Sequence, residues 1–160
     1  MNVAFINPFL ESMLHVLETM AKVQVTPGRP AIKQDGVARG DVTGLIGMTG
    51  DQARGSLAIS FTQPAILDIT ARILGDKLSA IDETVIDLVG EITNIVTGGA
   101  KRILSEKGYD FDMAIPAVVS GKDHIVNHKS KGAKIIIPFT TDAGNFFVEV
   151  CFEDTPANQH

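Results

Sequence analysis

The longest periodic segment of the sequence covers residues 81–105 and predicts one long amphipathic helix. At 100° of rotation per residue, one face of this helix is apolar and carries Ile81, Val85, Leu88, Ile92, Ile95, Gly99 and Ile103. A second set falls roughly opposite and consists of Asp87, Glu91, Asn94, Gly98 and Arg102. Gly108 is a suitable C-terminal stop. A helix of this kind needs another layer of structure against which to bury its apolar face.

Shorter elements are expected on both sides of this helix. Apolar spacing predicts a helix over 7–22 and a short helix over 63–74. A strand or two is expected within 23–40, and further strands over 113–120 and 124–127. Two β-hairpins are expected, one from 42–48 and 56–61 and the other from 133–140 and 145–152. The tail, residues 155–160, is expected to fray.

The order helix, strands, hairpin occurs twice, which suggests an internal duplication. We expect residues 1–160 to form a single mixed α/β (α+β) domain, an antiparallel sheet with long helices packed on it. Its two pseudo-symmetric halves would cover about 1–76 and 77–154. Any two amphipathic hairpins look alike, however, so at this point chance similarity explains the pattern equally well.

Composition narrows the classes of partner and of compartment. A net charge of −5 and a pI near 5.3 do not indicate a nucleic-acid-binding protein. The single cysteine, Cys151, excludes an internal disulfide and a multi-cysteine zinc site, and fits a reducing compartment. The N-terminal segment lacks the basic residues of a signal peptide, and the longest uncharged run, 55–67, is too short to span a bilayer. We therefore expect a cytoplasmic protein with no membrane partner.

Asp87, Glu91 and Asn94 lie at positions i, i+4 and i+7 and so share the solvent face of the long helix. A carboxamide can accept from and donate to one water molecule, and a carboxylate can pair with a cation. Glycine within a helix costs up to about 1 kcal/mol relative to alanine. Gly90 and Gly98 beside this stripe would let a partner approach closely. A plain solvated surface explains the same spacing.

The segment from Asp87 to Asn94 resembles the signature of the CheC/CheX/FliY family of chemotaxis phosphatases. That signature is Asp or Ser, three residues, Glu, two residues, Asn, and a proline about 22 residues later, where Pro116 stands. Residues 5–9 and 55–61 also resemble the family, and the likeness covers about residues 3–153. The first helix has Leu14 where the second has Asn94, so that copy looks degenerate. One intact motif resembles CheX more than CheC.

This resemblance implies a phosphatase acting on a phosphorylated CheY-like response regulator. Asn94 would orient the attacking water, and Glu91 would pair with a lysine of the receiver domain. Partner contacts are expected at Asp87, Gly90, Gly98 and Pro116. The protein would need no cofactor of its own, because Mg²⁺ would belong to the receiver, and relatives of this type are commonly homodimers. The alternative is a non-catalytic module that docks on a receiver or on a flagellar-switch protein.

His124 and His128 form a second possible site. On a strand they would share a face, so a metal pair is conceivable. No third ligand accompanies them in the sequence, and a solvated strand and turn is the favoured interpretation.

Overall fold

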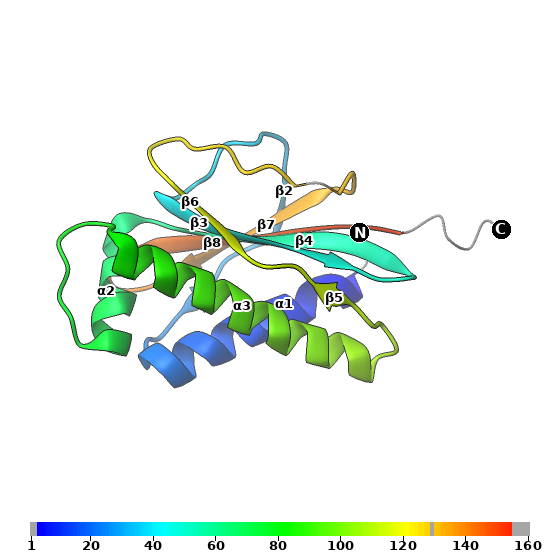
Figure 1. Ribbon diagram of the computed structural model, residues 1–160, viewed down its shortest axis with the longest axis horizontal. Helices are drawn as coiled ribbons and strands as arrows, with labels where there is room; N and C mark the ends of the chain where they lie inside the picture. Colours follow the sequence, from blue (N-terminus) through cyan, green and yellow to red (C-terminus); the bar gives the residue numbers. More distant parts are fainter. Residues whose placement is uncertain (1–2, 129, 155–160) are drawn as a thin grey trace.

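A computed structural model describes residues 3–128 and 130–154, and it shows two long helices packed on one face of an antiparallel sheet (Figure 1). The described strands form one eight-stranded sheet, in which the main strand order is β1-β7-β8-β4-β3-β5. β2 also pairs with β7, and β6 also pairs with β3. The expected α/β class, with helices on an antiparallel sheet, is confirmed.

The elements follow the expected order. The helices are α1 (Val3–Val16), which continues as the π-helical turn η1 (Leu17–Ala21), α2 (Gln63–Leu74) and α3 (Glu83–Glu106). The strands are β1 (Thr26–Pro27), β2 (Ala31–Lys33), β3 (Val42–Thr49), β4 (Ala53–Phe61), β5 (Asp112–Met113), β6 (Ala117–Ser120), β7 (Lys134–Thr140) and β8 (Asn145–Asp154). The first helix begins four residues earlier than expected because Phe5 is buried in the core. The tail, 155–160, lies outside the described residues.

Both predicted hairpins are present, and they join at the centre of the sheet. β3 pairs with β4, and β7 pairs with β8. The second strands of the two hairpins, β4 and β8, then pair with each other, with Leu57 opposite Val150. Internal duplication of the chain stays a prediction.

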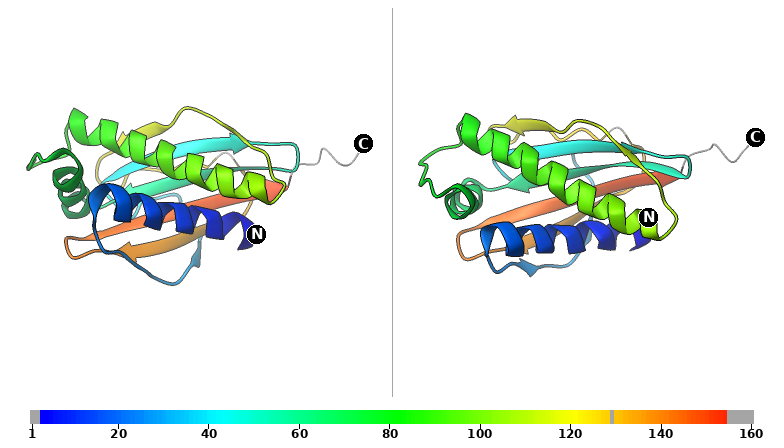
Figure 2. Two further views of the ribbon diagram at one scale, coloured as in Figure 1. Left: turned by 90° about the horizontal axis from the view of Figure 1, so that it is seen from below. Right: turned by 60° about the horizontal axis from the view of Figure 1, so that its bottom comes forward.

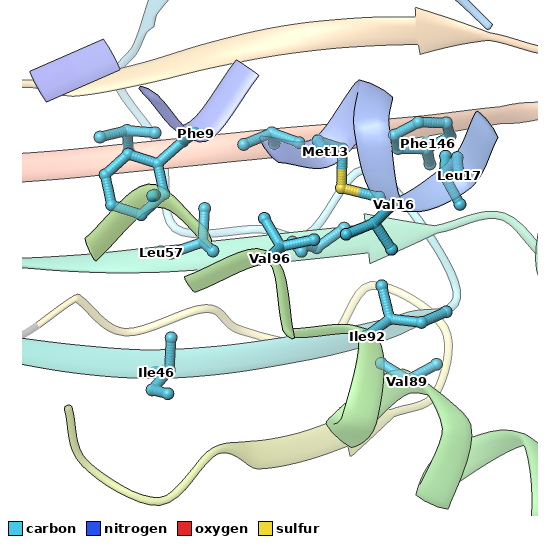
Figure 3. Close-up of a cluster of buried hydrophobic side chains, with 14 of the residues drawn as sticks. Phe9, Met13, Val16, Leu17, Ile46, Leu57, Val89, Ile92, Val96 and Phe146 are labelled. Atoms are coloured by element: carbon cyan, nitrogen blue, oxygen red, sulfur yellow. The ribbon is translucent and has the colours of Figure 1, made fainter. Parts of the chain in front are cut away.

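The main core lies between the sheet and the two long helices. Figure 2 shows α1 and α3 side by side across the same sheet face. In the close-up of Figure 3, Phe9 and Met13 from α1, Leu57 from β4 and Val96 from α3 meet in this layer; all four are fully buried. Full burial of such a side chain stabilises the fold by about 1.5–3 kcal/mol.

Two glycines let α3 lie close to its neighbours. A Cβ at Gly44, on β3, would collide with the Thr93 hydroxyl of α3. A Cβ at Gly99, on α3, would collide with Ser12 of α1, whose hydroxyl donates to the Val96 carbonyl at 2.7 Å. The absence of a side chain at Gly99 therefore lets α1 pack closely against α3.

The buried face of α3 differs from the predicted one. Ile95 was expected in the core but is 42% exposed, and Ile103 is half-buried. Thr93 and Thr97 are buried instead, because each hydroxyl donates to the helix carbonyl four residues earlier. That internal bond removes the cost of burying a threonine hydroxyl, so the polarity of these residues misdirected the prediction.

The strand expected over 113–120 is interrupted. β5 pairs with β3 at Met48, and β6 pairs with β3 from Leu45. Between these two pairing points β3 has two residues. The segment opposite has three, residues 114–116. This extra residue forms a β-bulge, and Pro116 has no N–H to contribute to a regular ladder.

Loops rather than strands cover the second face of the sheet. The strand expected over 124–127 is wrong, since that segment makes a single bridge between Val37 and Ile125. The 34–41 and 121–128 loops bond to each other through Val126 N–H to Gly36 O at 2.7 Å. They enclose a small cluster of Ala38, Ala58 and Val126.

A buried ion pair ties this loop layer to the sheet. Lys33 Nζ lies 2.7 Å from Glu149 Oε2, and both side chains are fully buried. His128 Nε2 donates to Glu149 Oε1 at 3.2 Å, while its Nδ1 lies 2.5 Å from Ser56 Oγ. Burial raises the pKa of Glu149, but the hydrogen bonds from His128 and Lys33 and the lysine charge outweigh it, so the net pKa lies below its ordinary value.

We predict that two alanine substitutions on β3 differ in their effect on the free energy of unfolding. Gly44→Ala should destabilise the protein by about 1–3 kcal/mol, because the new methyl overlaps Thr93. Gly47→Ala meets nothing within 4 Å and should be neutral or stabilising by about 0.5–1 kcal/mol. Urea unfolding at constant m-value measures both. Equal midpoints for the two variants would contradict the close packing of α3 on β3.

Lys33→Met should cost about 3–5 kcal/mol at pH 7, because it leaves Glu149 buried without its cation. The Glu149 pKa is depressed in the folded protein, so its contribution is present above about pH 4.5 and fades as pH falls further. Denaturant unfolding at pH 7 and pH 4 should therefore show a smaller difference from wild type at pH 4. The exposed Lys77→Met is the control, and an equal loss in both variants would count against the network.

Candidate functional site

The site is carried by α3, a helix of 24 residues, about 36 Å long. Asp82 caps its N-terminus, where its Oδ1 accepts from the Val85 N–H at 3.1 Å. Glu83 adds a favourable negative charge in the first turn. The N-cap, the contacts of α3 with the sheet and its contacts with α1 together determine which face of α3 points to solvent.

Asp87, Glu91 and Asn94 are all exposed on that face. No described residue pairs with any of the three through a hydrogen bond or an ion pair. Asn94 lies about 4.5 Å further along the helix axis than Glu91. The carboxylate and the carboxamide are thus one turn apart, held on a rigid element, and free to bind something outside the chain.

These side chains line one wall of an open groove of about 790 Å³. The α3 wall consists of Ile86, Asp87, Gly90, Glu91 and Asn94. The opposite wall comes from the bulge and β6 and consists of Ala114, Ile115, Pro116 and Val118. In Figure 1 the strand that contains β6 runs beside α3. Five of the six residues predicted for the site therefore share one groove.

The sixth, Gly98, borders the next hollow along α3, of about 570 Å³, together with Lys101 and Arg102. A Cβ at Gly98 would meet nothing within 4 Å, so the surface above it is open. Gly90 differs, because a Cβ there would already touch Val118 of β6 at 3.5 Å. The clearance expected at both glycines is thus present in the structure at Gly98, while Gly90 also allows β6 to lie near the helix.

Ile115 belongs to this groove and was not identified from the sequence. Its side chain is 90% exposed on the bulge, immediately before Pro116. An isoleucine between alanine and proline in an apolar segment reads as a buried strand residue. The bulge that turns it outward is set by pairing with β3, which no local pattern indicates.

The two histidines considered as a metal pair are used inside the protein. His124 Nδ1 donates to Gly121 O at 2.7 Å, and its Nε2 accepts from Thr43 Oγ1 at 2.5 Å. His128 joins Ser56 and Glu149. Within residues 3–128 and 130–154, no three His, Cys, Asp or Glu side chains are grouped so as to hold a metal ion.

None of the helices in the described part of the chain has the length and hydropathy needed to cross a membrane.

Residues 42–140 match the family model for the chemotaxis phosphatase CheX. This span includes Asp87, Glu91, Asn94 and Pro116, and it covers more than half of the chain.

Three relatives extend the match over almost the whole chain. A crystal structure of a CheC-like superfamily protein from Shewanella sp. PV-4 is 59% identical, with a TM-score of 0.90 over 96% of this chain and 99% of that one. The CheY-P phosphatase CheX of Thermotoga maritima is 25% identical over 88% of this chain and 89% of its own length. A CheX–CheY–BeF3–Mg²⁺ complex from Borrelia burgdorferi is 26% identical, with a TM-score of 0.78 over 93% and 97% of the two chains.

Proposed function

Because this chain belongs to the CheX family of chemotaxis phosphatases, we propose that it hydrolyses the aspartyl phosphate of a phosphorylated CheY-like response regulator. The observation that carries this proposal is the exposed pair Glu91 and Asn94, which lines a groove and has no partner among the described residues. The Thermotoga maritima relative, a CheY-P phosphatase, supports the substrate class. The Borrelia burgdorferi complex with CheY supports the kind of partner.

In this mechanism α3 enters the active site of the receiver, and the Asn94 amide binds the attacking water. The water oxygen attacks phosphorus, and the bond between phosphorus and the aspartyl oxygen breaks. The products are inorganic phosphate, which keeps the proton lost by the water, and the free aspartate carboxylate. Mg²⁺ held by the receiver offsets the negative charge of the phosphoryl group. Phosphoryl transfer depends mainly on positioning and electrostatics, so one oriented amide on a rigid helix is a sufficient contribution from this chain.

Glu91 anchors the complex. Its carboxylate is exposed and one turn from Asn94, so it can pair with a lysine in the active site of the receiver. Such a contact sets the distance between Asn94 and phosphorus as well as the affinity. Asp87, Gly90, Gly98 and Pro116 surround this pair and contact the partner surface.

Two further features complete the proposal. We also propose that the protein acts in the cytoplasm, together with its receiver substrate, and that it forms a homodimer. The alternative function, a docking module without catalysis, does not explain why an amide stands at Asn94. The two functions can be distinguished by removing that amide. Loss of the amide lowers the rate of receiver dephosphorylation if the protein is a phosphatase, and leaves that rate unaffected if it is a docking module.

Asn94→Ala should lower the rate of receiver dephosphorylation by about 100-fold or more, because the water loses its orienting group. Affinity for the receiver and unfolding midpoint should stay near wild type, since Asn94 is exposed. Phosphate release from a receiver phosphorylated with acetyl phosphate measures the rate. Asn7→Ala, which removes an exposed asparagine of α1, is the matched control. Full activity in Asn94→Ala would contradict the mechanism.

Glu91→Ala should weaken both binding and rate, because the lysine of the receiver loses its counter-charge. Titration of the receiver activated with beryllofluoride and Mg²⁺ should show a higher Kd, with a smaller dependence on salt than in wild type. Glu11→Ala, at an exposed glutamate of α1, should leave the Kd unchanged. An unaltered salt dependence in Glu91→Ala would argue against the ion pair.

A further inference from the structure

Ile115 is the most exposed large hydrophobic side chain among the described residues, at 90%. Isolated exposed hydrophobic residues are common and need no special explanation. Ile115 differs from the other exposed residues, such as Ile32 and Ile125, by its location, because it lines the groove that contains Glu91 and Asn94.

The bulge at residues 114–116 explains why this side chain points outward. Ala114 N–H still bonds to Gly47 O at 3.0 Å, so the strand keeps its contact with β3 up to this residue. The extra residue then breaks the alternation of side chains between the two sheet faces. Bulges are frequent beside active sites, where they redirect a side chain. Here the redirected side chain is a large apolar one.

The groove therefore combines two kinds of contact. Its α3 wall offers carboxylates and an amide, and its bulge wall offers Ile115 with Pro116 and Val118. A receiver that surrounds α3 at Asn94 would also lie against the bulge, because Asn94 and Ile115 line the same open groove. Apolar area covered at the centre of such a contact contributes to affinity without taking part in chemistry.

We propose that Ile115 is the apolar anchor that docks the receiver domain while α3 reaches the phosphoryl group. This inference rests on the proposed function and names the residue that sets affinity for the receiver rather than rate. The opposite wall favours a receiver over a second copy of this chain. Two copies meeting at this groove would bring the Asp87 and Glu91 carboxylates of one near those of the other, whereas a receiver that presents a lysine is complementary.

The test is a comparison of Ile115→Ser with wild type in two assays. Steady-state dephosphorylation of the phosphorylated receiver should show KM raised about tenfold and kcat unchanged within twofold, as expected for lost burial of one isoleucine. Titration with the receiver activated by beryllofluoride and Mg²⁺ should show the same rise in Kd. Ile115→Met keeps an apolar side chain of similar size and should restore both values. Ile125→Ser, which removes a 63% exposed isoleucine outside the groove, should leave both unchanged.

The possible outcomes distinguish failure of the Ile115 anchor from failure of the proposed phosphatase function. If wild type neither binds nor dephosphorylates the receiver, the proposed function and the anchor both fail. If wild type is active and Ile115→Ser matches it, the anchor alone is overturned. A fall in kcat at unchanged KM would overturn it as well. A change of mass in light scattering with unchanged Kd would show that Ile115 joins two copies of this chain instead.

Discussion

The close packing of α3 between the sheet and α1 is the constraint on which the rest of the structure depends. Gly44 of β3 and Gly99 of α3 are the points where a single methyl group would force these elements apart. Thr93 and Ser12 fill the space, and each donates its hydroxyl to a carbonyl of α3. Contacts on two sides fix the rotation of α3 as well as its position. The exposed face therefore has to be the one that carries Asp87, Glu91 and Asn94.

The second wall of the site depends on the sheet edge rather than on the helix. The bulge between β5 and β6 exists because β3 pairs with both segments in registers that differ by one residue. It sets Ile115 and Pro116 opposite Glu91 and Asn94. Both walls of the groove therefore pack against β3, so the packing of the core determines the geometry of the groove. Such preorganisation is what water positioning requires.

The elements that sequence predicts well are those with a strong local signal. Both hairpins and α3 follow from the spacing of apolar residues and from turn residues, and the 87–91–94 motif falls on the exposed face as expected. Predictions fail where the polarity of a residue does not decide whether it is buried. Thr93 and Thr97 are buried because their hydroxyls bond within the helix, and Ile115 is exposed because of strand register. The buried Lys33–Glu149 pair joins residues 116 positions apart, so no local sequence pattern indicates it.

We propose that α3 enters the active site of a phosphorylated receiver, with Asn94 holding the water that attacks phosphorus. A crystal structure of this protein with a CheY-like receiver activated by beryllofluoride and Mg²⁺ tests it most directly. We expect the receiver to cover Glu91 and Asn94, with a water between the Asn94 amide and the beryllium, in line with the bond from beryllium to the aspartate. A complex in which the receiver binds another face and leaves Asn94 in solvent would contradict it.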